Sequence, residues 1–363
     1  GVYQKLFGVA GSGKTLVLAY RAAKLLEQKK KVLIICFNIT LKHYIRQQIK
    51  KARLEFDWRN LTIDHFHGFT KKYADLKDIS YPFGGSNKEN IMEHVNRVVE
   101  HRKVDKNYRK YDAILIDEGQ DFDEQWYKFL CDFLSQNNEI LFAIDKKQNI
   151  YEKDLSWVKG RPGYLLDQGY RIPKNQIKII NNFSKEFLKI SDDNAESSKI
   201  LPPEDNQLSL LPMKYESIWE NVDSFGDVIK QVHKKLLYLI NELSMKKSDI
   251  VILVDKNKEG IELKKYIQDK LEIKNIMDIF SKANNPVGRL KKTAFRIDSP
   301  YLKMSTMHSF KGWEARNVII VTPENTSVHS HMYAALTRVR ENLIVVNQNK
   351  IYKKFGTENF QNF

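Results

Sequence analysis

The segment Gly8–Thr15, GVAGSGKT, combines residue types that can hold phosphate. It matches G-x-x-x-x-G-K-[ST], lies after an apolar run at 5–10 and precedes a helical pattern at 16–28. Glycines let backbone N–H groups wrap a phosphate, and a helix N-terminus adds a favourable dipole. Lys14 is then expected to reach the β- and γ-phosphates, and Thr15 to hold Mg²⁺. The residues predicted to bind nucleotide here are Gly8, Gly11, Ser12, Gly13, Lys14 and Thr15.

A pair of carboxylates, Asp117 and Glu118, stands at the end of the apolar run AILIDE at 113–118. A carboxylate at that place can bind Mg²⁺, and a second one beside it can deprotonate an attacking water. Taken alone, the pair is also compatible with an acidic loop after a buried strand. Together with the phosphate-binding loop it favours a triphosphate hydrolase, although the loop alone does not separate a kinase from a GTPase or a motor.

The net charge of +15 and the pI near 9.4 favour a polyanionic partner, because cations that neutralise phosphates release condensed counterions. A merely solvated basic surface is an equal alternative on charge alone. The two cysteines, Cys36 and Cys131, lack metal-ligand spacing and are expected to be buried and reduced. No apolar segment is long enough to cross a membrane and no signal peptide opens the chain, so we predict a cytoplasmic protein with no membrane partner.

Apolar runs rich in Val and Ile alternate with longer helical patterns, which is typical of an α/β fold with parallel sheets. Strands are predicted at 5–10, 31–37, 61–66, 113–118 and 139–145 in a first half, and at 164–170, 249–255, 302–307, 317–323 and 342–347 in a second. The interruption at 152–163 predicts two domains, 1–157 and 158–363, and the polar segment 191–207 predicts an exposed loop.

Eight segments in chain order resemble the motifs of superfamily 1 helicases of the UvrD/Rep type. They are 8–15, 33–45, 63–69, 117–121, 143–151, 167–173, 304–320 and 333–346. The resemblance implies ATP as the nucleotide and two RecA-like domains. The segments 70–112 and 256–301 are short, so the accessory insertions of such helicases are expected to be short or absent, and translocation is better supported than processive unwinding.

The resemblance also implies roles for single residues. Asp117 and Thr15 would hold Mg²⁺, and Glu118 would be the general base. The remaining implied roles are γ-phosphate sensing by Gln148, arginine fingers from Arg171 and Arg338, a ribose contact from Glu314, and adenine stacking on Tyr170. Arg338 is also compatible with a surface ion pair, and Tyr170 with a core position at the end of a strand.

A groove for single-stranded DNA is implied by the same resemblance, and stacking of bases on aromatic rings suits a motor that moves over any sequence. Phe37 is also compatible with a core position. The chain reads Tyr151-Glu152-Lys153 where relatives carry a second aromatic residue, so Trp157 is a candidate to take over that stacking. The predicted nucleic-acid residues are Phe37, Asn38, His67, Tyr151, Trp157, Thr306 and His308.

The sequence therefore predicts an ATP-dependent translocase or helicase on single-stranded DNA, moving 3′ to 5′ as the resemblance implies. The segments Gly8–Thr15 and Cys36–Leu41 resemble helicase modules of bacterial nuclease-helicase proteins, some of which act against phages, so a missing N-terminal nuclease-type region and a role in DNA repair or defence are expected. Two alternatives stay open. One is an ATP-gated switch that controls a partner nuclease with little unwinding, and the other is a helicase directed to RNA.

Overall fold

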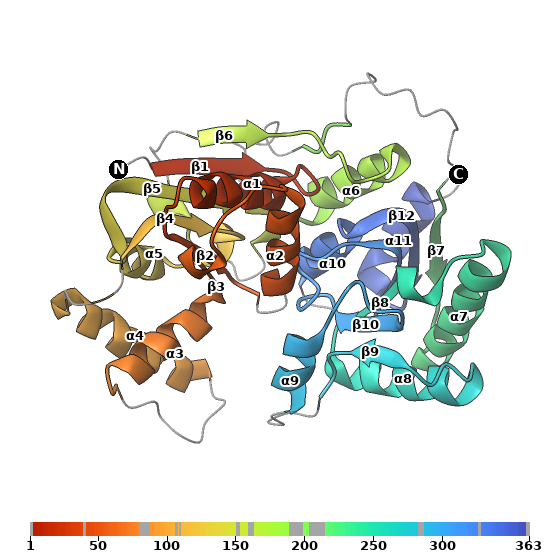
Figure 1. Cartoon of the computed structure of the whole chain (residues 1–363). Coiled ribbons are helices and arrows are strands. Elements are labelled where there is room, and N and C mark those ends of the chain that lie inside the picture. Colours follow the sequence, from red (N-terminus) through yellow and green to blue (C-terminus); the bar gives the residue numbers. More distant parts are fainter. Residues whose placement is uncertain are drawn as a thin grey trace. The chain divides into compact units, whose positions relative to one another are not determined.

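A computed structural model describes residues 3–38, 41–79, 88–105, 108, 110–149, 153–158, 163–188, 199–202, 215–281, 287–325 and 328–360. For residues 88–92, 136–138 and 289 the description covers the backbone. The chain divides into two compact units, one of Gly1–Gly8 with Gly13–Leu166 and the other of Val9–Ser12 with Asp167–Phe363 (Figure 1). Each unit is built on one sheet, and the two are described in turn.

The sheet of the first unit has six strands in the order β3-β2-β4-β5-β1-β6, and all their pairings are parallel. β2 is buried along its whole length, as expected for a strand of a parallel sheet covered on both faces. The strands are β1 (Tyr3–Gly8), β2 (Val32–Cys36), β3 (Leu61–His65), β4 (Tyr111–Ile116), β5 (Leu134–Ile144) and β6 (Gly163–Leu166).

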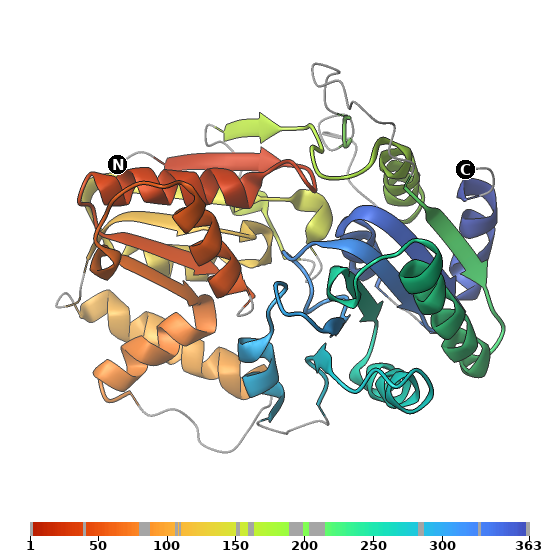
Figure 2. The same cartoon turned by 45° about the vertical axis from the view of Figure 1, so that its right-hand side comes forward.

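Helices cover this sheet and connect its strands. α1 packs on the sheet and against α2, while α3 and α4 form a pair that meets α5 through α4 (Figure 2). A core of aromatic side chains fills the space under α3, α4 and α5. The helices are α1 (Lys14–Glu27), α2 (Leu41–Lys51), α3 (Phe66–Leu76), α4 (Lys88–Val104) and α5 (Glu124–Cys131), with the 3-10 turns η1 (Trp58–Asn60), η2 (Gly119–Asp121), η3 (Lys146–Gln148) and η4 (Ser156–Val158).

The sheet of the second unit also has six strands, in the order β7-β12-β11-β8-β10-β9, and is parallel throughout. The central strands β8 and β10 are fully buried. The strands are β7 (Ser217–Asn221), β8 (Ile250–Val254), β9 (Ile276–Asp278), β10 (Leu302–Thr306), β11 (Ala315–Thr322) and β12 (Val339–Asn347).

The helices of the second unit form two groups: α7 packs beside α8, and α6 lies against α10 and α11 (Figures 1 and 2). They are α6 (Lys174–Phe187), α7 (Phe225–Leu237), α8 (Asn257–Lys270), α9 (Val287–Ala294), α10 (His329–Leu336) and α11 (Lys350–Asn359), with a π-helical turn η7 (Tyr238–Glu242) and a 3-10 turn η8 (Lys247–Asp249).

The two parallel sheets confirm the predicted α/β fold class and are consistent with two RecA-like domains. One strand assignment is wrong. The strand predicted at 164–170 as part of the second half is β6, which pairs with β1 in the first sheet. Its residues form a regular strand locally, and only the pairing partner decides to which sheet it belongs.

Candidate functional site

The phosphate-binding loop connects β1 to α1, as its flanks predict. Gly11 and Gly13 have φ of +75° and +90°, a left-handed conformation that favours glycine. Lys14 is the first residue of α1, so the amide groups at the start of the helix face the loop. The Ser12 hydroxyl is buried and has no hydrogen-bond partner among the described residues. A loop of this shape, with an unused buried hydroxyl, fits an oxyanion such as phosphate.

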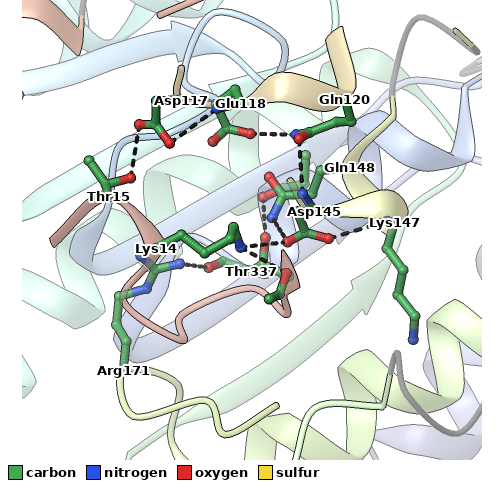
Figure 3. Close-up of polar contacts among 12 residues, drawn as sticks. Lys14, Thr15, Asp117, Glu118, Gln120, Asp145, Lys147, Gln148, Arg171 and Thr337 are labelled. Atoms are coloured by element: carbon green, nitrogen blue, oxygen red, sulfur yellow. Dashed lines mark hydrogen bonds and ion pairs between the residues drawn. The ribbon is translucent and has the colours of Figure 1, made fainter. Parts of the chain in front are cut away.

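The Lys14 ammonium is held by two acceptors within the first unit. Nζ donates to the Gly8 carbonyl at 2.9 Å and forms an ion pair with Asp145 Oδ2 at 3.2 Å (Figure 3). Gly8 is the last residue of β1 and Asp145 directly follows β5, and the carboxyl ends of these neighbouring strands meet at one edge of the parallel sheet. That edge is where open α/β sheets bind their ligands.

Asp117 and Glu118 lie at the same edge, directly after β4. The Thr15 hydroxyl donates to Asp117 Oδ2 at 3.0 Å, and the Glu118 amide donates to Asp117 Oδ1 at 3.1 Å. Burial, together with the neighbouring charge of Glu118, raises the pKa of Asp117 to about 6. A divalent cation would stabilise a carboxylate that is both buried and next to a second negative charge. The Thr15 hydroxyl beside it is a further oxygen ligand of the kind that Mg²⁺ prefers.

Gln120 and Asp145 connect these groups, and the sequence analysis assigned a role to neither. Gln120 Nε2 donates to Glu118 Oε2, while its Oε1 accepts the Asp145 amide at 2.9 Å (Figure 3). Gln148 Nε2 donates to Asp145 Oδ2 at 2.8 Å, so the predicted phosphate sensor belongs to the same network. The signal available in the sequence was the position of Gln120 inside the segment DEGQD.

Two of the predicted second-unit residues meet in an ion pair. Arg171 donates to Glu314 Oε2 at 2.9 Å and to the Thr337 carbonyl at 2.9 Å. Glu314 precedes β11 and Thr337 lies two residues before β12, so both are at the amino ends of neighbouring strands. Arg338 is 3% exposed, and its Nε donates to the Ala334 carbonyl at 2.7 Å.

Tyr170 is 67% exposed, and its hydroxyl donates to Gln168 Oε1 at 2.5 Å. A core position for this ring is therefore wrong, since an aromatic ring this exposed offers its face to solvent or to a ligand.

Three of the nucleic-acid residues predicted in the first unit lie around α5. Phe37 and His67 are partly buried and contact the Trp126 ring, with centroids 6.3 Å and 5.2 Å from it. Trp157 packs on Tyr127, at 5.1 Å between centroids. Burial lowers the pKa of His67 to about 4, so its ring is neutral at physiological pH.

The other nucleic-acid candidates have separate positions. The Asn38 carbonyl accepts the Leu41 amide at 3.1 Å where α2 begins, and Tyr151 lies outside the described residues. In the second unit, Thr306 ends β10 and is 8% exposed. Burial and the nearby charge of His331 lower the pKa of His308 to about 4.

In the described ranges, no helix is both long and apolar enough to cross a membrane. The same residues contain no group of three or more His, Cys, Asp or Glu side chains that could hold a metal ion. The Thr15 hydroxyl and the Asp117 carboxylate, 3.0 Å apart, are oxygen donors whose chemistry fits Mg²⁺.

A protein-family model described as an AAA domain matches residues 3–154. Among solved structures, the arterivirus nonstructural protein 10 (helicase) in complex with DNA is similar at 10% identity and a TM-score of 0.44, over 98% of this chain and 62% of that one. The same helicase without DNA is similar at 11% identity and a TM-score of 0.45, over 97% of this chain and 61% of that one. The chain thus spans less than two thirds of these helicases. No curated protein matches the sequence.

The AAA domain match and the polar network coincide on one segment of the chain. Residues 3–154 contain the phosphate-binding loop, the carboxylate pair after β4 and the turn η3 that carries Gln148. This segment therefore carries the first-unit residues whose chemistry fits a nucleotide.

Proposed function

We propose that this chain is an ATP hydrolase of the UvrD/Rep-like superfamily 1 type, stimulated by nucleic acid, which moves along single-stranded DNA. The observation that carries the proposal is the contact between Thr15 and Asp117 with Glu118 directly beside it, at the edge of the sheet that also holds Lys14. A hydroxyl, a carboxylate and a second carboxylate in this order are the set needed to hold Mg²⁺ and to activate water.

The four site residues of the first unit then have defined roles. Lys14 exchanges its ion pair with Asp145 for the phosphates of ATP, while Thr15 and Asp117 hold Mg²⁺, which neutralises charge on the phosphate oxygens when bound. Glu118 accepts the proton of the attacking water, in the orientation that its contact with Gln120 gives it.

Residues of the second unit are proposed to add to the nucleotide contacts. Arg171 and Arg338 supply positive charge to the γ-phosphate, Glu314 binds the ribose, and Tyr170 stacks on the adenine. The high exposure of Tyr170 supports stacking. The contacts of Arg171 with Glu314 and of Arg338 with Ala334 mean that both guanidinium groups must change partners to do so.

Single-stranded DNA is proposed as the track because stacking of bases on aromatic rings is tolerant of sequence and the basic chain favours phosphates. Movement from 3′ to 5′, and a place as the module of a larger nuclease-helicase in DNA repair or anti-phage defence, are the finer parts of the proposal. They rest on the resemblance of the motifs, above all of Gly8–Thr15 and Cys36–Leu41.

The test is steady-state ATP hydrolysis with no nucleic acid, single-stranded DNA, single-stranded RNA or duplex, at two salt concentrations. We expect single-stranded DNA to stimulate the rate strongly and added salt to weaken that effect. Lys14→Ala and Glu118→Gln should abolish hydrolysis, whereas Lys24→Ala should not, because this lysine of the same helix is exposed and pairs only with Glu27 among the ion pairs of the described residues.

Each other outcome has a meaning. Stimulation by RNA alone would replace DNA by RNA as the track. A second assay uses single-stranded DNA with streptavidin bound to a biotin at one end, which a translocase displaces. Stimulation by DNA without this displacement would favour the ATP-gated switch over the translocase. Where displacement occurs, the end from which streptavidin is removed gives the polarity. If no nucleic acid changes the rate, the proposed function is wrong.

A further inference from the structure

Trp126 is the meeting point of several aromatic side chains in the first unit. It lies in α5, is 4% exposed, and stands five residues after the end of η2. The Phe66 ring lies nearly parallel to its indole, with centroids 4.2 Å apart and planes 13° apart. The Phe37 ring is also nearly parallel to it, at 6.3 Å and 17°. The His67 ring meets the indole edge-on at 5.2 Å and 80°.

Two of these neighbours are predicted nucleic-acid residues that come from different segments. Phe37 follows β2, whereas His67 belongs to the first turn of α3. Both are partly buried and both contact the Trp126 ring. A large, flat and buried ring that contacts both of them restricts their rotamers, because packed interiors leave little space for alternatives.

A cation completes the surroundings of the indole. Lys153 Nζ lies 5.3 Å from the Trp126 ring centroid, within the range of a cation–π contact, and 2.6 Å from Asp123 Oδ2. The backbone of Lys153 is tied to the Asn149 side chain by hydrogen bonds of 2.8 Å and 2.9 Å. Since Asn149 follows Gln148 directly, Lys153 connects Trp126 to the residue next to the predicted phosphate sensor.

The indole therefore contacts two predicted nucleic-acid residues, Phe37 and His67, and also Lys153, which is hydrogen-bonded to the residue after Gln148. An ordinary core tryptophan would be surrounded by apolar side chains, but here His67 and Lys153 are polar neighbours. We propose that Trp126 is a positioning residue that holds Phe37 and His67 in place for an unstacked base of single-stranded nucleic acid. This inference rests on the proposed function.

Trp126→Leu tests it, with Phe133→Leu as the matched control. Phe133 is fully buried in the same aromatic core and packs on Phe69 and Phe129. Among the ring contacts of the described residues it has none with Phe37, His67 or Trp126. The readouts are the concentration of a labelled oligo(dT) that half-saturates the protein in fluorescence anisotropy, the oligo(dT) concentration that gives half-maximal ATPase stimulation, and the melting temperature.

For Trp126→Leu we expect both oligo(dT) concentrations to rise about tenfold, since Phe37 and His67 would lose the ring that fixes the positions in which they stack on a base. The kcat at saturating oligo(dT) should keep most of its value, because no group at Lys14 or Glu118 is changed. Trp126→Phe, which retains a flat ring, should recover most of the affinity. Phe133→Leu should lower the melting temperature without shifting either concentration.

If Trp126→Leu shifts the oligo(dT) concentrations no more than Phe133→Leu does, Trp126 is a core residue only and the inference is overturned, while the proposed function stands. A wild-type protein whose ATPase responds neither to oligo(dT) nor to any other nucleic acid overturns the proposed function, and this inference falls with it. The two failures are therefore distinguished by the behaviour of the wild type.

Discussion

Replacing Gln120 by leucine should separate the orientation of the general base from nucleotide binding. The Gln120 side chain is 0% exposed and makes two hydrogen bonds, to the Glu118 carboxylate and from the Asp145 amide. Leucine has a similar volume and can make neither. A bond to a charged group contributes about 1.5–3 kcal/mol and a neutral one about 0.5–1.5 kcal/mol. We therefore expect the free energy of unfolding to fall by about 2–4 kcal/mol.

The effect on catalysis follows from the first of these two bonds. If the bond to Glu118 stabilises the transition state for hydrolysis by its full free energy, its loss of about 1.5–3 kcal/mol corresponds to a decrease in kcat of about 10- to 100-fold. Nucleotide affinity should change little, because the contacts of Lys14 and Thr15 are untouched. The assays are stimulated ATP hydrolysis, titration with a fluorescent nucleotide, and chemical denaturation.

Asn317→Leu is the matched control. Asn317 is a buried carboxamide of the second unit that also makes two hydrogen bonds, to the Asp249 carbonyl at 3.2 Å and from the Asn342 amide at 2.7 Å. Because both of its bonds join neutral groups, it should lose about 1–3 kcal/mol of stability and keep its kcat. The reasoning would be refuted by a Gln120→Leu protein that loses stability but hydrolyses ATP at the wild-type rate, or by equal losses of kcat in both variants.

Three further predictions concern the loop, the metal and a buried cation. Gly13→Ala should lower the free energy of unfolding by about 1–2 kcal/mol, because a left-handed backbone costs an L-residue that much and a Cβ at Gly13 meets no atom within 4 Å that could add a clash. Chemical denaturation checks this, and unchanged stability contradicts it. EDTA should stop hydrolysis, and Asp117→Asn should raise the Mg²⁺ concentration for half-maximal rate; a rate independent of Mg²⁺ contradicts both. Burial lowers the pKa of Lys303 from 10.5 to about 8, so the native state loses this proton before the unfolded state does. The free energy of unfolding of the wild type, relative to that of Lys303→Met, should therefore rise by about 3 kcal/mol from pH 8 to 10.5. Denaturation of both proteins measures this difference, and a difference that does not change with pH would contradict the prediction.

The sequence predicts the strands that are long and apolar. β2 and β8 are continuous apolar runs, β4 ends in one and β10 mixes apolar with polar residues, and the structure has each of them within two residues of its predicted bounds. It does not predict β7 and β9. β7, SIWEN, is a polar edge strand that is only partly buried, and β9 has three residues, so neither carries a local pattern that differs from a loop.

The site was predictable where one short segment carries the chemistry. The motif Gly8–Thr15 is one contiguous segment and the pair Asp117 and Glu118 is another. The structure brings the two segments to one edge of the first sheet. The contacts of Lys14 with Asp145 and of Gln120 with the Asp145 amide join residues 131 and 25 positions apart. They depend on β5 lying between β1 and β4, which is a property of strand order that no local pattern encodes.

The two cysteines differ in a way that matters for labelling. Cys36 lies in the fully buried strand β2, and burial raises the pKa of its thiol, so little of the reactive thiolate forms there at neutral pH. Cys131 is the last residue of α5 and is partly exposed. A maleimide dye should therefore attach to Cys131 alone in the folded protein. This gives a spectroscopic reporter on the helix that carries Trp126, without any cysteine having to be engineered.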